Sequence, residues 1–174
     1  MAERLRESIA RGELPACCQA WAGTVRDLPS DARFDAILYV DVLEHVRDDA
    51  AELVAAAGAL SPGGALIVLA PAHGWLYSPF DRAIGHYRRY TRRSLAAVGP
   101  PGLRLVVLRY LDSVGLLASA GNRFVLRKST PTAGDIARWD QLMVPVSRWL
   151  DPWLGFRIGK SVLGVWRAEP RAPR

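Results

Sequence analysis

The sequence predicts an α/β fold in which a largely parallel sheet is covered by helices. Two apolar runs of strand length, FDAILYV at 34–40 and ALIVLA at 65–70, flank an alanine-rich segment from Asp48 to Leu60 with acids in its first turn. A third apolar run, from Leu103 to Tyr110, follows the break at Gly99–Gly102. Buried strands that alternate with helices at this spacing are typical of a parallel sheet.

The segments before the first apolar run predict one helix and one more strand. Residues Met1 to Arg11 place Leu5 and Ile9 on one helical face, and Gly12 is a helix stop signal. Ala16 to Ala22 has the length of a strand. We therefore expect the sheet to begin before the FDAILYV run.

The second half of the chain predicts short helices and a closing strand. Thr91 is suited to cap a short helix that ends near Val98. The later elements are expected at Asp112–Arg127 (helix), Ala133–Leu150 (helix) and Ser161–Ala168 (strand). The last two strands have helical residues between them and could pair antiparallel. We predict a single domain over 1–174, with a helical insertion at about 112–160 and a frayed tail at about 169–174.

Composition excludes several classes of protein. Half of the 174 residues are hydrophobic and 23% are charged, which is typical of a globular domain. No run of 18 apolar residues is present, so we expect no membrane span. The first residues lack the apolar core of a secretory signal, which predicts a cytoplasmic protein. The net charge is +6, but no basic run with interleaved aromatics forms a nucleic-acid track, so we expect no nucleic-acid partner.

Residues 34–71 carry a set of motifs that belong together. The set consists of Phe34-Asp35, Leu43-Glu44-His45, Leu60-Ser61-Pro62-Gly63-Gly64 and the strand Leu66–Pro71. This segment resembles the fourth strand, the following helix and the fifth strand of class I S-adenosylmethionine (SAM)-dependent methyltransferases, in the methyltransferase type 11/12/23-like group. The resemblance implies SAM as the cofactor and a Rossmann-like sheet in the order 3-2-1-4-5-7-6.

The resemblance also implies that the sheet is incomplete. The chain would supply strands 3 to 7, with the predicted strand at Ala16–Ala22 as strand 3. The family's glycine-rich loop, typically E/D-x-G-x-G-x-G, and the acid that holds the ribose are not found in the sequence. We therefore expect an N-terminally truncated methyltransferase with impaired SAM binding. Without strands 1 and 2, the 34–40 strand becomes an edge with no Lys or Pro to protect it. Either strand 3 pairs with this strand directly, or the edge stays bare and drives self-association. In both cases we expect the isolated chain to express poorly, or to be oligomeric or aggregated.

Cofactor-binding residues are expected where strands end. In open α/β sheets, ligands bind beyond the carboxyl ends of the strands. The residues that the resemblance places at the cofactor are Thr24, Val25, Val40, Asp41, Val42, Glu44 and His45. The family commonly has Asp where Thr24 stands. For Glu44 and His45, the alternative is a hydrogen-bonded helix start without chemistry.

The stretch SPFDRAIGHYRRYTRRSL, residues 78–95, resembles a D-x-x-x-G-H-x-RR-[YF]-[TS] signature of some of these enzymes. His86 and Tyr90 are the predicted catalytic residues, because such groups orient or deprotonate a nucleophile. The predicted substrate residues are His73, Tyr77, Arg88 and Arg89. Alternatively, the two arginines pair with Asp81 and with nearby helix acids.

The expected function is SAM-dependent methyl transfer to an unidentified small-molecule or lipid-like acceptor, impaired in this chain. The alternative is a catalytically silent fragment or a non-enzymatic partner subunit. The sequence has no cluster with metal-ligand spacing, so no metal is expected.

Overall fold

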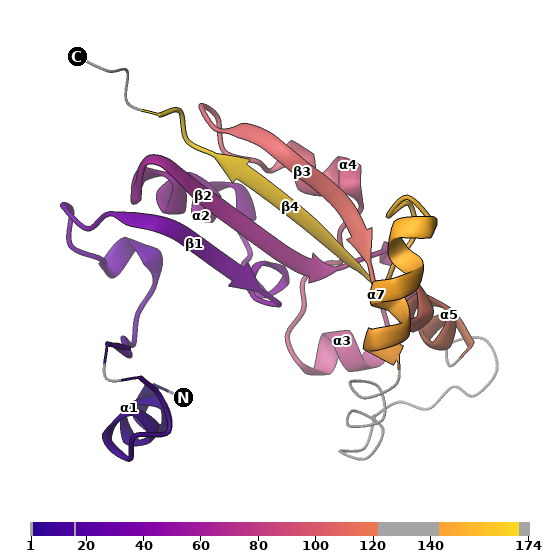
Figure 1. Cartoon of the computed structure of the whole chain (residues 1–174), viewed down its shortest axis with the longest axis horizontal. Helices are drawn as coiled ribbons and strands as arrows, with labels where there is room; N and C mark the ends of the chain where they lie inside the picture. The colour runs from indigo at the N-terminus through magenta and orange to yellow at the C-terminus, as the bar shows by residue number, and fades with distance from the viewer. Residues whose placement is uncertain (1, 16, 122–142, 171–174) are drawn as a thin grey trace. The chain divides into compact units, whose positions relative to one another are not determined.

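The computed structural model describes residues 2–15, 17–121 and 143–170, and it divides into two compact units, Met1–Ala32 and Arg33–Arg174 (Figure 1). The first unit contains α1 (Ala2–Ala10) and the 3-10 helix η1 (Val25–Asp27). The predicted first helix is therefore confirmed.

The predicted strand at Ala16–Ala22 is wrong, since residues 17–22 form no strand. The amide of Cys18 donates to the carbonyl of Pro15 at 2.9 Å and closes a turn instead. The segment has no β-branched residue and is rich in Ala, which strands disfavour.

The second unit is built on a four-stranded mixed sheet. Its strands are β1 (Phe34–Val40), β2 (Leu60–Pro71), β3 (Arg104–Leu111) and β4 (Ser161–Arg167), in the order β1-β2-β4-β3. β1 and β2 are parallel, and β4 is antiparallel to both β2 and β3. In the family's numbering this order is 4-5-7-6, which is the predicted part of the sheet. The antiparallel pairing expected for the last two strands is confirmed by β3 and β4. No described strand takes the place of strand 3.

The Ser61-Pro62-Gly63-Gly64 part of the motif lies within β2 as a large bulge. Phe34 pairs with Leu60 and Ala36 with Ala65, so four residues of β2 oppose Asp35 alone. A Cβ at Gly64 would lie 2.8 Å from the carbonyl of Ser61, which explains why a glycine stands there.

Two helices pack on one face of the sheet (Figure 1). They are α2 (Asp49–Gly58), which Asp48 caps, and α4 (Arg92–Ala97), which Thr91 caps as predicted. Their apolar side chains meet those of β2 and β4, and the buried set includes Leu53, Ala56, Leu66, Val68, Leu95, Val162 and Trp166. Burial of these side chains provides the main stabilisation of the unit.

The opposite face of the sheet carries partly exposed apolar side chains. Leu38 and Val40 of β1 are 61% and 50% exposed. Their register partners on β2, Ile67 and Leu69, are partly exposed. We call Leu38, Val40, Ile67 and Leu69 the open face.

The remaining helices follow the strands. They are η2 (Leu43–His45), η3 (Gly74–Leu76), α3 (Pro79–Ala83), α5 (Ser113–Gly121) and α7 (Val144–Trp153). α5 and α7 confirm parts of the two predicted insertion helices, and residues 122–142 of that insertion lie outside the described residues. Among the described residues, no helix has the length and apolar character needed to cross a membrane.

Candidate functional site

The carboxyl ends of β1, β2 and β3 meet at one edge of the sheet. Ser161 at the start of β4 pairs with both Pro71 and Leu111, and Val40 at the end of β1 pairs with Leu69 of the parallel β2. Just beyond each of the three strands, one non-glycine residue has a positive φ: Asp41 (50°), His73 (63°) and Asp112 (65°). Such backbone is uncommon outside glycine and often marks functional sites. The edge predicted to bind ligand is therefore also where the chain is conformationally strained.

The segment from His86 to Tyr90 folds back over this edge. The amide of Tyr90 donates to the carbonyl of Pro71 at 2.9 Å, and the amide of His73 donates to the carbonyl of Tyr90 at 2.8 Å. The amide of Tyr87 donates to the carbonyl of Glu44 at 2.8 Å. Backbone hydrogen bonds thus bring the two predicted motifs together.

A buried carboxylate, Asp81, anchors the returning segment. Its Oδ2 accepts from the amide and hydroxyl of Ser78 at 2.8 and 2.7 Å, in the capping box of α3. Its Oδ1 accepts from Nδ1 of His86 at 2.9 Å and from Nε of Arg89 at 2.9 Å. Burial raises the pKa of Asp81, but the Ser78 hydroxyl, the Arg89 charge and His86 outweigh it, so the pKa is lowered. The ionised carboxylate fixes the orientation of His86.

Glu44 is a buried carboxylate of a different kind. Its residue is 0% exposed, and neither side-chain oxygen has a hydrogen-bond partner among the described residues. Oε1 lies 3.6 Å from Nε2 of His86. Burial raises the pKa of Glu44, and the charge of Asp41 adds to this effect, despite the opposing influence of its own backbone amide and of the charges of His45 and Arg89. The alternative reading, a satisfied hydrogen-bonded helix start, does not describe the Glu44 carboxylate.

His45 lies beside this pair. Its ring meets the ring of His86 edge-on, with centroids 4.5 Å apart. His45 itself is exposed. One side of the group formed by Glu44, His45 and His86 therefore faces solvent.

Tyr90 and Arg88 form a second network around Asp49, the first residue of α2. The Tyr90 hydroxyl donates to Oδ2 of Asp49 at 2.7 Å, and Nη1 of Arg88 donates to the same oxygen at 2.8 Å. Tyr90 is 2% exposed, and its burial raises its pKa. Arg89 is held by Asp81. Each arginine thus pairs with an acid, as the alternative from the sequence expects, and the catalytic role of Tyr90 stays a prediction.

The predicted substrate residues His73 and Tyr77 also have internal partners. Nε2 of His73 donates to the carbonyl of Gly159 at 3.0 Å, and its ring stacks on Tyr110 with centroids 4.7 Å apart. The pKa of His73 is lowered, mainly by burial. The hydroxyl of Tyr77 donates to the carbonyl of His86 at 2.7 Å.

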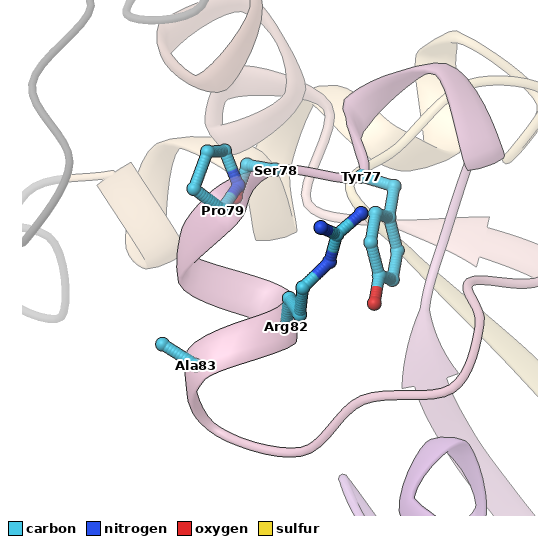
Figure 2. A pocket seen from close by; sticks show the side chains of 5 residues that line it. All are labelled: Tyr77, Ser78, Pro79, Arg82 and Ala83. Carbon is cyan, nitrogen blue, oxygen red and sulfur yellow. The ribbon is translucent and has the colours of Figure 1, made fainter.

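Tyr77 also lines a hollow of about 390 Å³ on α3, together with Ser78, Pro79, Arg82 and Ala83 (Figure 2). In Figure 2 the side chain of Arg82 extends alongside the Tyr77 ring. Sequence reasoning did not select Arg82. The capping pattern Ser78-x-x-Asp81 could have located the α3 turn that presents it.

Thr24 and Val25 lie in the first unit. Thr24 caps η1, and its amide and hydroxyl donate to Oδ2 of Asp27 at 2.6 and 2.9 Å. Val40, Asp41 and Val42 lie at the end of β1, where all three are exposed. These three predicted cofactor residues thus lie at the carboxyl end of β1, as expected.

Comparisons with known proteins agree with this fold. The family model described as "Methyltransferase domain" matches residues 1–68. No curated protein sequence matches the chain.

Three solved structures illustrate the similarity in fold. The N-methyltransferase NodS from Bradyrhizobium japonicum WM9, in complex with S-adenosyl-L-homocysteine, is 13% identical with a TM-score of 0.53, over 97% of this chain and 63% of that one. The [4+2]-cyclase SpnF is 13% identical with a TM-score of 0.58, over 98% and 63%. Phosphoethanolamine N-methyltransferase 2 of Haemonchus contortus is 13% identical with a TM-score of 0.52, over 95% and 40%.

The chain thus spans less than two thirds of the length of each of these structures. At identities this low, the similarity to these structures shows a shared fold alone. Residues 1–68 thus match the methyltransferase-domain model, and the chain shares its fold with solved SAM-dependent methyltransferase structures.

Proposed function

We propose that this chain carries part of the active site of a SAM-dependent methyltransferase that acts on a small-molecule acceptor. The observation behind the proposal is the meeting of Glu44 and His86, 3.6 Å apart, at the edge where β1 and β2 end. In open α/β sheets this edge is the ligand-binding edge. Because one fold serves several reactions, this site and the family motifs, and not the fold alone, support the function.

The cofactor side of the site is the exposed end of β1. SAM carries a positive charge on its sulfonium sulfur, and it would supply a methyl group to the acceptor with the neutral thioether S-adenosylhomocysteine as the leaving group. Asp41 is exposed at this end, and the buried Glu44 lies behind it. The two acids attract a cation, and Val40 and Val42 offer apolar contact at the same place.

The acceptor side is the returning segment and the hollow on α3. A volume of about 390 Å³ is within the range of small-molecule pockets. Arg82 is an exposed cation there and suits an acceptor that bears an anionic group. We assign His86, which Asp81 holds in place, to contact with the acceptor. Holding both reactants in line is the main contribution that a protein makes to such a transfer.

The 174-residue chain by itself should bind SAM weakly, because its sequence contains no glycine-rich loop. Loss of two or three polar contacts, at roughly 1–3 kcal/mol each, lowers affinity by orders of magnitude. Calorimetric titration with SAM measures this directly. A low-micromolar dissociation constant would contradict the expectation of impaired binding.

Ultraviolet cross-linking with methyl-labelled SAM tests the site even when binding is weak. We expect label in the peptide that contains residues 40–45 and a lower yield for Asp41→Asn. Asp35→Asn, at the other end of β1 and also exposed to solvent, is the matched control and should keep the parent yield. Label outside this peptide, or equal yields for the two variants, would refute the cofactor site.

A further inference from the structure

We infer that Glu44, His45 and His86 form a binding site for one divalent transition-metal ion. Each residue offers one ligand atom, and these atoms all lie within 4.8 Å of one another. The inference goes beyond methyl transfer and does not depend on it. It also departs from the sequence expectation of no metal, because Glu44 and His45 are distant from His86 in the sequence and only the fold brings them together.

The buried carboxylate of Glu44 is the strongest indication of a missing positive partner. The residue is 0% exposed and both oxygens lack a hydrogen-bond partner among the described residues. Buried charges in proteins are normally paired or coordinate metals, since an unpaired one is costly. A metal ion would satisfy this carboxylate where no described protein group does.

His86 is already oriented as a metal ligand. Its Nδ1 donates to Oδ1 of Asp81 at 2.9 Å, which leaves the lone pair of Nε2 free, and Nε2 lies 3.6 Å from Oε1 of Glu44. A carboxylate that accepts the second ring N–H is the usual support of a metal-binding histidine. Two ligands of a tetrahedral zinc site, each ~2.1 Å from the ion, lie about 3.4 Å apart. The Nε2–Oε1 separation is therefore close to that of two ligands of one ion.

His45 would complete the set from the solvent side. Its ring stands edge-on to that of His86, and the residue is exposed, so the ring has room to turn toward the ion. Sites with three protein ligands keep further positions for water or substrate. The exposed side of His45 is where such positions would open.

The donor set selects the class of metal. Two imidazoles and one carboxylate suit Zn²⁺, Co²⁺, Mn²⁺ or Fe²⁺, whereas Mg²⁺ and Ca²⁺ favour sites made of oxygen. We therefore assign the site to a first-row divalent ion. Zn²⁺ and Co²⁺ are the practical probes.

Titration with Co²⁺, followed by its visible absorption, and competition with Zn²⁺ test the site. The protein should carry Cys17→Ser and Cys18→Ser, because both thiols are exposed, and no affinity tag. We expect one ion per chain. Glu44→Gln and His86→Gln should each weaken binding at least tenfold.

His73→Gln is the matched control, since His73 is the one histidine of three outside the cluster. It should leave the affinity within twofold of the parent. Absence of binding, or equal losses for His73→Gln and His86→Gln, would overturn the inference. These titrations contain no SAM, so their failure would leave the cross-linking result at residues 40–45 intact.

Thermal melts separate loss of a ligand from loss of the fold. In EDTA, Glu44→Gln should melt no lower than the parent, because the substitution removes an unpaired buried charge. With excess Zn²⁺ the parent should melt at a higher temperature and Glu44→Gln should not, since a ligand stabilises only the state that binds it. An equal shift for both proteins would contradict the site.

Discussion

Nδ1 of His86 lies 2.9 Å from Oδ1 of Asp81, and the same oxygen accepts from Nε of Arg89 at 2.9 Å and forms an ion pair with its Nη2 at 2.8 Å. One buried oxygen therefore fixes both the histidine and the segment that carries it over the strand ends. The position of His86 relative to Glu44 depends on this contact.

Asp81→Asn should destabilise the protein by about 3 kcal/mol, because Arg89 would keep a buried charge without its partner. Urea unfolding at neutral pH measures the loss. Asp35→Asn, at an exposed position, is the control and should change stability by less than about 0.5 kcal/mol. The same Asp81 variant should bind Co²⁺ about 10–100-fold more weakly, as expected when the support of a ligating histidine is lost. An unchanged Co²⁺ affinity would show that Asp81 does not position His86.

Tyr90→Phe should cost about 1–2 kcal/mol, because it removes a buried hydrogen bond to the carboxylate of Asp49. Tyr87→Phe changes a tyrosine that is 54% exposed and should be neutral. The two variants are compared by urea unfolding. Equal stabilities would show that the hydrogen bond from the Tyr90 hydroxyl to Asp49 does not stabilise the fold. That result would favour the predicted catalytic role of Tyr90.

Asp151→Ala should destabilise the start of α5. The carboxylate of Asp151, on α7, accepts from the amides of Asp112 and Ser113 at 2.8 and 3.0 Å. Loss of such a cap costs about 1–2 kcal/mol. Hydrogen exchange should accelerate at the amides of Asp112 and Ser113, whereas Arg148→Ala, exposed on the same helix, should leave them protected. Equal exchange in both variants would show that α5 does not depend on this cap.

Asp27 should titrate below its ordinary range in the parent protein. The backbone amide and then the hydroxyl of Thr24 lower the pKa of Asp27. The stability that this pairing contributes is present above the unfolded pKa and is lost as the pH falls through the folded one. Thr24→Val removes the hydroxyl and should raise the pKa of Asp27, whereas Thr24→Ser keeps it and should not. Carboxyl chemical shifts followed by NMR from pH 2 to 6 decide between these outcomes.

Self-association should proceed through the open face and the β1 edge. Leu38 is 61% exposed on an edge strand, and exposed apolar edges recruit other strands. Light scattering after size-exclusion chromatography should give a mass above 19.1 kDa for the parent and a lower one for Leu38→Glu. Val54→Glu, exposed on α2, is the matched control and should behave as the parent. A monodisperse 19.1 kDa parent would disprove the association.

The elements that the sequence predicted correctly are those with strong local signals. The apolar runs at 34–40 and 65–70 became parallel neighbours, and Thr91 caps α4. Each depends on local hydrophobicity or on a capping hydroxyl, which a short window of sequence contains. The strand predicted at 16–22 had only its length in its favour, and strand pairing depends on neighbours that a local window does not reveal.

The roles of individual side chains were harder to predict. The motif that contains Arg88, Arg89 and Tyr90 reads the same whether these side chains contact a ligand or pair with an acid of the protein. Contacts with Asp49 and Asp81 decide between these two roles. Sequence alone determined the fold class and the edge of the sheet where the motifs gather, since both follow from hydrophobic pattern and turn residues. Only the tertiary structure decided that Glu44 lies buried and unpaired beside His86, because that arrangement depends on hydrogen bonds between segments distant in the chain.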